Sequence, residues 1–233
     1  MDAHDAAEFY TSRLGGVAAL LLRERLAALW PDLSRQSVLG LGYATPYLRL
    51  WREGAARCVA LTPAHVGAAA WPPGAPGLAC TAEEDALPFP DLCFDRVLVV
   101  HGLEAAERTG RLLRELWRVL RDDGRLLIVT PNRSGMWAHM ESTPFGQGQP
   151  YSAGQISRLL GAAMFRIERR DTALYVPPTG LRLVLRSARL WERAGHALVP
   201  GLAGVTITEA VKDQYAGLPT AAARRRIAFA HSA

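Results

Sequence analysis

The chain has 233 residues, a length at which one α/β domain buries a sizeable core. A hydrophobic fraction of 49% and a charged fraction of 21% are ordinary for a globular protein. The formal net charge is +5, but the arginines are scattered among acids and only Arg224–Arg226 form a run. Because nucleic-acid binding usually needs a concentrated basic stripe, we do not expect nucleic acid as a partner.

The beginning of the chain and its cysteines bear on location. Asp2 and Asp5 stand where a signal peptide carries positive charge, and the apolar run Gly16–Leu22 is too short to span a membrane. The three cysteines share no metal-ligand spacing, and Cys58 and Cys80 lie in apolar, strand-like surroundings typical of buried thiols. We therefore expect no metal site, no transmembrane segment and a cytoplasmic location.

The first part of the chain predicts a helical region and then an alternation of short elements. A helical pattern runs from Asp5 to Leu29, with Gly15–Gly16 as the point of division into two helices and Pro31 as its end. Strands alternate with helices after it, and we expect them at Ser37–Leu41 (strand), Pro46–Glu53 (helix), Cys58–Leu61 (strand), Pro63–Ala70 (helix) and Leu78–Cys80 (strand).

The second part contains the clearest elements. Arg96–Val100 and Arg125–Thr130 are apolar at consecutive positions, which predicts neighbouring interior strands buried on both faces. Between them, Thr109–Arg121 has the pattern of an amphipathic helix that ends in a turn at Asp123–Gly124. Phe165–Tyr175 and Val205–Val211 are expected to form a closing pair of strands.

These elements predict an α/β fold with a doubly wound, mostly parallel sheet and helices on both faces. In such sheets ligands bind at the carboxyl ends of the strands. We expect one domain over residues 1–219, with an N-terminal helical cap at 1–30 and a helical insertion at 177–200, and a flexible tail at 220–233. Ser152 and Gln155 predict a capping box before a further helix that ends near Ala163.

The segment Leu87–Arg133 contains four motifs in order: LPFPD, FDRVL, H-x-L-E, and R-V-L-x-x-x-G-R-L-L-I followed by P-N-R. This combination resembles the central block of the type 11 group of class I S-adenosylmethionine (SAM)-dependent methyltransferases, which includes quinone-biosynthesis and related small-molecule enzymes. The resemblance implies a Rossmann-like sheet with an antiparallel last strand, SAM as cofactor, and methyl transfer to a small-molecule substrate. The alternative is a methyltransferase-fold protein that has lost SAM and acts as a binding or scaffolding partner of another protein.

The family's cofactor motif, roughly D-x-G-x-G-x-G, is only partly present. Gly42 matches the first glycine, whereas Gly40 replaces the acid, and Ala44 and Pro46 replace the other glycines. Ala44 fits only if its φ angle is negative, and Pro46 could serve as the first residue of the following helix. Where the family places the ribose-binding carboxylate, the chain has Ala60. We therefore expect SAM to bind weakly.

The resemblance also assigns positions to the rest of the cofactor site. Glu83, with Glu84 beside it, occupies the place of the acid that receives the adenine amino group. Tyr43 could stack on the ligand or be a core aromatic residue. The expected cofactor-binding residues are Gly42, Tyr43, Ala44, Thr45, Glu83 and Glu84.

His101 follows the fourth strand and is the candidate catalytic residue, because an imidazole at that edge can accept a proton from a substrate hydroxyl or amine. The alternative is an imidazole that only hydrogen-bonds a loop. Glu104 is expected to cap the helix that follows, and the long loop over residues 133–152 to cover the site. The basic helix at 181–196 is open to three interpretations: a substrate lid, a partner surface or a membrane-surface helix.

Overall fold

The computed structural model describes residues 3–64, 67, 70–72, 74 and 77–213 of the chain. These residues form a seven-stranded sheet in the order β3-β2-β1-β4-β5-β7-β6. The strands are β1 (Ser37–Gly42), β2 (Arg57–Pro63), β3 (Ala79–Ala82), β4 (Phe94–Val100), β5 (Leu120–Pro131), β6 (Phe165–Ala173) and β7 (Val205–Lys212). Strands β1 to β5 pair in parallel, and β7 is antiparallel to both β5 and β6. The predicted doubly wound, mostly parallel sheet with an antiparallel last strand is confirmed.

The two central strands lie where their apolar runs predict. Val97 of β4 is in register with Leu126 of β5 and, on the other side, with Leu39 of β1, so β4 is an interior strand. Asp95 fixes the start of this register, since its carboxylate accepts a hydrogen bond from the Ser37 backbone N–H at 2.7 Å. The prediction that β4 and β5 are neighbouring interior strands is therefore confirmed.

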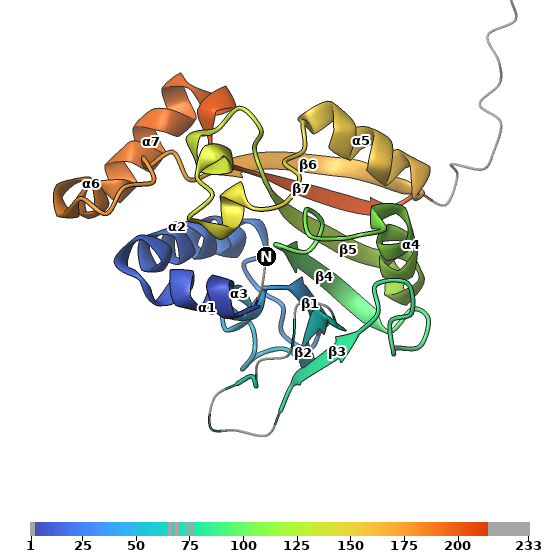
Figure 1. Ribbon diagram of the computed structural model, residues 1–233. Helices are drawn as coiled ribbons and strands as arrows, with labels where there is room; N and C mark the ends of the chain where they lie inside the picture. The colour runs from blue at the N-terminus through green and yellow to red at the C-terminus, as the bar shows by residue number, and fades with distance from the viewer. Residues whose placement is uncertain (1–2, 65–66, 68–69, 73, 75–76, 214–233) are drawn as a thin grey trace, which may run out of the picture.

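Helices cover both faces of the sheet (Figure 1). They are α1 (Ala3–Thr11), α2 (Arg13–Leu29), α3 (Thr45–Leu48), α4 (Thr109–Val119), α5 (Ala153–Ala162), α6 (Arg182–Arg186) and α7 (Ala188–Leu198), with short 3₁₀ helices η2 (Met136–His139), η3 (Pro144–Gly146) and η4 (Pro200–Leu202). Alternate residues of the strands face opposite layers, because side chains in a strand point to the two faces in turn. Leu98 and Val100 pack with the α2 and α3 side, whereas Val97 and Val99 pack with α4 and α5.

The N-terminal helical region divides at Ser12 and not at Gly15–Gly16. The Ser12 side chain accepts a hydrogen bond from the Gly15 backbone N–H and so caps α2. A Cβ atom on Gly15 would lie 2.0 Å from the Phe9 carbonyl oxygen, whereas one on Gly16 would meet nothing within 4 Å. Gly15 is therefore required for the close approach of α1 to α2, and the sequence interpretation of the pair as a helix break was wrong.

Other boundaries differ from the predictions by a few residues. Helix α4 ends at Val119, because Leu120 already has extended backbone angles and β5 begins there. Helix α3 is a single turn, shorter than the predicted Pro46–Glu53. The capping box of Ser152 and Gln155 is present. Pro63, the first residue of the predicted helix at 63–70, belongs to β2, and four of the eight residues of that prediction lie outside the described residues. The predicted tail at 220–233 also lies outside them, and the domain limits stay a prediction.

Among the described residues, no helix is both long enough and apolar enough to cross a bilayer.

Candidate active site at the carboxyl edge of the sheet

The turn after β1 keeps the backbone shape that its glycine suggests. Gly42 has a φ angle of +81°, and a Cβ atom there would lie 2.3 Å from the Val100 carbonyl oxygen, so only glycine fits. The Tyr43 backbone N–H then donates to Val100 at 2.8 Å and ties the turn to β4. Ala44 has a φ angle of −86° and is the N-cap of α3, with Pro46 in the first helical turn. Alanine and proline thus replace two glycines without strain.

His101 follows β4 in an uncommon backbone conformation. Its φ angle is +53°, which is rare for a residue with a side chain and costs of the order of 1 kcal/mol. The buried imidazole is held on both sides: Nδ1 lies 3.2 Å from Glu104 Oε1, and Nε2 lies 2.8 Å from the Tyr10 hydroxyl. Glu104 therefore orients His101 and does not cap the following helix, contrary to the prediction.

The hydrogen-bond directions follow from the chemistry of the partners. Carboxylate oxygens accept hydrogen bonds, so we assign the hydrogen of His101 to Nδ1 and leave Nε2 as an acceptor. Tyr10 then donates to Nε2, and Tyr47 donates to the Tyr10 oxygen at 2.8 Å. Burial raises the pKa of both Tyr10 and Tyr47, so both hydroxyls keep their protons near neutral pH.

Tyr10 fills the space between the β1 turn and the residues after β4. Its ring stacks on Tyr43 with centroids 5.3 Å apart and an angle of 10° between the planes. It comes from α1, outside the segment that carries the methyltransferase motifs. In this conformation the Tyr10 side chain occupies the place between Gly42–Thr45 and His101, where the resemblance puts the methionyl end of SAM.

The loop after β5 covers the same site. Phe145 is buried with its ring 4.6 Å from the His101 ring, and Trp137 packs on Phe145 at 5.3 Å. Gly148 has a φ angle of +85° and approaches Glu104 so closely that a Cβ atom would lie 2.7 Å from the Glu104 carbonyl oxygen. Glu104 Oε2 is buried beneath this cover and has no hydrogen-bond partner in the described part of the chain. A buried carboxylate oxygen without a partner is costly in free energy.

The acidic residues after β3 have different environments. Glu83 is exposed, whereas Glu84 is buried and its carboxylate accepts hydrogen bonds from the backbone N–H groups of Glu107 and Arg108. Both residues line an open cavity of about 440 Å³ together with Ala64 and Asp85. Glu84 therefore supports the segment that leads into α4, and Glu83 has the freer carboxylate.

The LPFPD segment is fixed by two side chains of α4. The Leu87 backbone N–H donates to Glu115 at 2.9 Å, and the Arg118 guanidinium donates to the carbonyl oxygens of Leu87 and Phe89. Arg118 also pairs with Asp91 at 2.8 Å. The motif and the helix that follows β4 are thus one hydrogen-bonded unit, which explains why the two occur together.

The fit to SAM is partial. The Gly42 turn, the exposed Glu83 and the cavity beside it suit the cofactor, but β2 ends in Thr62 and Pro63, with Ala64 after it, and offers no carboxylate to the ribose. The Tyr10 side chain also occupies the place of the methionyl end of SAM. The residues therefore fit SAM once Tyr10 has moved, with fewer polar contacts than the family motif provides.

The structure brings all seven expected site residues to the carboxyl edge of the sheet: Gly42, Tyr43, Ala44 and Thr45 at the end of β1, Glu83 and Glu84 after β3, and His101 after β4. Tyr10 was not recognised as a site residue from the sequence, because no local pattern links α1 to His101, 91 positions away. Glu104 was expected to cap a helix and not to contact His101. Among the described residues, no group of three or more His, Cys, Asp or Glu side chains could hold a metal ion.

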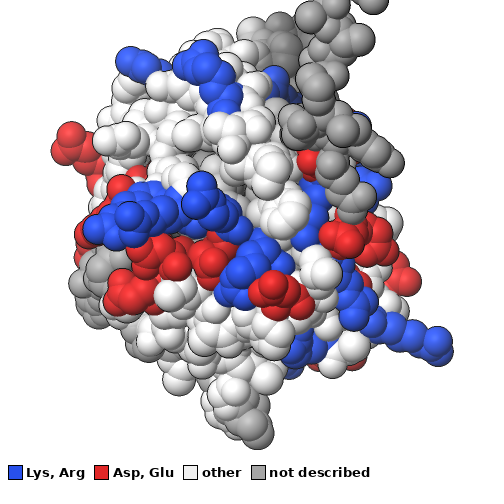
Figure 2. Space-filling model, turned by 90° about the vertical axis from the view of Figure 1, so that its right-hand side faces the viewer, with Lys and Arg blue, Asp and Glu red and all other residues white. Residues whose placement is uncertain are grey.

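Charges of both signs are mixed over the face that carries α4 (Figure 2). Arg108 and Arg111 both pair with Asp85, and Arg121 pairs with Asp95 at 2.8 Å. Such paired arginines do not form the free basic stripe that nucleic acid would require.

Comparisons with known proteins agree with this architecture. Residues 38–128 match the family model described as a methyltransferase domain. The chain is 30% identical over 129 residues to an uncharacterised protein of Mycobacterium tuberculosis, a match that covers 52% of this chain and 45% of that protein. It is 30% identical over 109 residues to a demethylmenaquinone methyltransferase of Thermus thermophilus, over 46% of this chain and 49% of that one. The matches thus span about half the length of these relatives.

The fold is shared more widely than the sequence. A SAM-dependent methyltransferase from Archaeoglobus fulgidus superposes with a TM-score of 0.58 at 15% identity, over 82% of this chain and 93% of that chain. By sequence, residues 38–128 resemble a methyltransferase domain, and the chain shares the fold of class I methyltransferases.

Proposed function

We propose that the chain is a SAM-dependent methyltransferase for a small-molecule substrate and that it binds SAM weakly between Gly42–Thr45 and Glu83. The observation that carries the proposal is the His101–Glu104 pair, which is buried at the carboxyl edge of the sheet directly opposite the Gly42 turn. A left-handed His101 and an unpartnered Glu104 oxygen are costs that packing alone does not explain.

In this proposal the backbone of the Gly42 turn faces the methionyl end of SAM, and Glu83 receives the adenine amino group. Tyr10 has to leave its place beside Tyr43 before the cofactor enters. SAM supplies an electrophilic methyl group. Since no carboxylate reaches the ribose from the end of β2, one charge-assisted contact is missing, which weakens binding roughly tenfold to a hundredfold.

The role proposed for His101 follows from the same contacts. When Tyr10 moves, Nε2 of His101 becomes a free acceptor that can take the proton of a substrate hydroxyl or amine. Glu104 accepts from Nδ1–H and stabilises the imidazolium that results. Phe145 and Trp137 exclude water above the ring. The place we propose for this reaction is the cytoplasm, where the free thiols of the chain stay reduced.

The experiment is a thermal melt with millimolar S-adenosylhomocysteine, the demethylated form of SAM, on the unmodified chain and two variants. Ligand at a hundred times its dissociation constant stabilises a protein by about 2.7 kcal/mol, which is a clear shift in melting temperature. Glu83→Ala should abolish the shift. Glu53→Ala, which removes a 91% exposed carboxylate just before β2 at the opposite edge, should retain it. An unmodified chain that shows no shift would contradict methyl transfer and favour a scaffolding role.

A further inference from the structure

Helix α7 has a buried side made of very small residues. Ala188 and Gly195 are buried, and a Cβ atom on Gly195 would lie 2.4 Å from the Tyr175 ring. Glu192 lies beside them and accepts hydrogen bonds from the backbone N–H groups of Tyr175 and Leu174, at 2.6 Å and 3.2 Å. The helix is thus fixed to the molecule through its smallest side chains and one inward-facing carboxylate.

The large apolar side chains of the same region point to solvent. Leu190 is 67% exposed and Leu198 is 78% exposed, although both belong to α7, and Leu183 of α6 reaches 81%. Further exposed apolar residues of this region are Leu181, Trp191, Val199 and Leu202. Residues 181–202 therefore form a continuous segment whose bulky hydrophobic side chains make little contact with the sheet, and we call it the α6–α7 surface.

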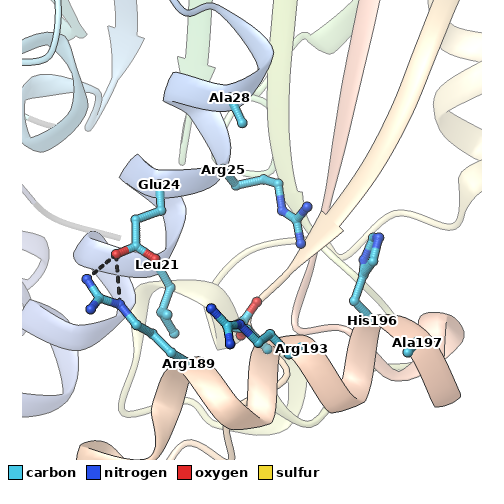
Figure 3. A pocket seen from close by; sticks show the side chains of 9 residues that line it. Leu21, Glu24, Arg25, Ala28, Arg189, Arg193, His196 and Ala197 are labelled. Carbon is cyan, nitrogen blue, oxygen red and sulfur yellow. Dashed lines mark hydrogen bonds and ion pairs between the residues drawn. The ribbon is translucent and has the colours of Figure 1, made fainter.

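Arginines accompany these apolar side chains. The α6–α7 surface contains four of them, Arg182, Arg186, Arg189 and Arg193, and Glu192 is its single acid. Figure 3 shows Arg193 and His196 on the side of α7 that faces α2, where Arg189 pairs with Glu24. The groove between the two helices has a volume of about 570 Å³. Because Glu192 is turned inward, the exposed charges of the surface are positive.

The position of the surface relates it to the candidate active site. β6 ends at Ala173 and β7 begins at Val205, which is in register with Pro131 at the carboxyl end of β5. Helices α6 and α7 therefore leave the sheet at the same edge as the Gly42 turn and His101, and they project from the molecule (Figure 1).

We propose that the α6–α7 surface docks on an anionic phospholipid bilayer. Leucine and tryptophan side chains on one side of a short helix enter the boundary between headgroups and acyl chains, while arginines beside them meet the phosphates. This surface has both components, with no exposed acid among them to repel the lipid charge. The partner is a membrane surface on which the protein lies, and the docked orientation turns the site's edge of the sheet toward the bilayer.

The test is co-sedimentation of the full chain with vesicles of phosphatidylcholine alone and of phosphatidylcholine with an equal share of phosphatidylglycerol. We expect binding to the anionic vesicles that weakens as salt is raised. An arginine near an anionic surface contributes about fivefold in partitioning, so the double variant Arg182→Glu and Arg186→Glu should bind at least about 25-fold more weakly. The matched control, Arg114→Glu with Arg158→Glu on the exposed sides of α4 and α5, makes the same charge change and should bind much like the unmodified chain.

A second double variant, Leu190→Ser with Leu198→Ser, tests the apolar component. Both side chains are mostly exposed, so the melting temperature should change little while vesicle binding is lost. Equal binding by the arginine variant and its control, or no preference for anionic vesicles, would overturn the proposal. A different result would also overturn it: the unmodified chain does not bind vesicles but forms a dimer in sedimentation velocity, and the leucine variant is monomeric. The surface would then serve a protein partner.

Discussion

The position of Tyr10 leads to an unusual expectation: removing its side chain should make the protein less stable and at the same time improve ligand binding. Tyr10 makes two side-chain hydrogen bonds, to Tyr47 and His101, and stacks on Tyr43. A net hydrogen bond contributes about 1 kcal/mol, and an aromatic pair contributes about as much beyond its burial. Tyr10 thus stabilises the filled site by about 3 kcal/mol.

Moving Tyr10 out of the site costs the same free energy, and this cost reduces the affinity for SAM. A site whose open form lies about 3 kcal/mol above the filled form binds roughly a hundredfold more weakly than the open form alone. Tyr10→Ala should therefore lower the melting temperature and tighten S-adenosylhomocysteine binding by about tenfold to a hundredfold. Tyr10→Phe keeps the ring and loses both hydrogen bonds, so its binding should be intermediate.

Calorimetric titration measures the affinity, and a thermal melt without ligand measures the stability of each variant. Glu8→Ala, an exposed change on the same helix, is the control and should alter neither quantity much. If Tyr10→Ala binds S-adenosylhomocysteine no better than the unmodified chain, then Tyr10 does not compete with the cofactor. Weaker binding would mean that Tyr10 is part of the cofactor's own contacts, which also refutes the reasoning.

Three further changes test separate parts of the site and its scaffold. His101→Ala should lower the rate of methyl transfer by about 10²–10⁴-fold in steady-state kinetics, without weakening S-adenosylhomocysteine binding in calorimetry; an unchanged rate would remove His101 from the chemistry. Glu84→Ala should cost about 1–3 kcal/mol of unfolding free energy in a denaturant titration, since two backbone N–H groups lose their acceptor, and a neutral result would show that water replaces it. Gly15→Ala should destabilise the chain, because its Cβ atom would meet the Phe9 carbonyl oxygen, whereas Gly16→Ala should stabilise it by about 0.5–1 kcal/mol; equal effects would refute the close helix contact.

The sheet could be predicted because the sequence pattern of each strand lies within a few consecutive residues. Arg96–Val100 and Arg125–Thr130 show burial on both faces within a few consecutive residues, and Asp95, directly before the first run, ties β4 to β1 through the Ser37 backbone N–H. The turn at Gly42 was also predictable, since the substitutions at Ala44 and Pro46 are compatible with the angles found. The strands and the turn were therefore predicted correctly, because the residues that determine each of them lie within the same short segment of the sequence.

The interior of the site could not be predicted in this way. Tyr10, Tyr47 and His101 are far apart in the sequence and meet only through tertiary packing. The pair Gly15–Gly16 has the composition of a helix break, and only the neighbouring Phe9 backbone shows that Gly15 serves close packing. Glu104 has the position of a helix cap, but the left-handed His101 turns the imidazole toward it.

The central claim, that this site binds SAM, is tested most directly by calorimetric titration of the unmodified chain with S-adenosylhomocysteine at up to millimolar concentration. The account predicts one molecule bound per chain with a dissociation constant between micromolar and millimolar, as expected for a site that lacks two acidic anchors and from which Tyr10 has to be displaced. A flat titration at millimolar ligand, from a chain that is folded by its thermal melt, would contradict it.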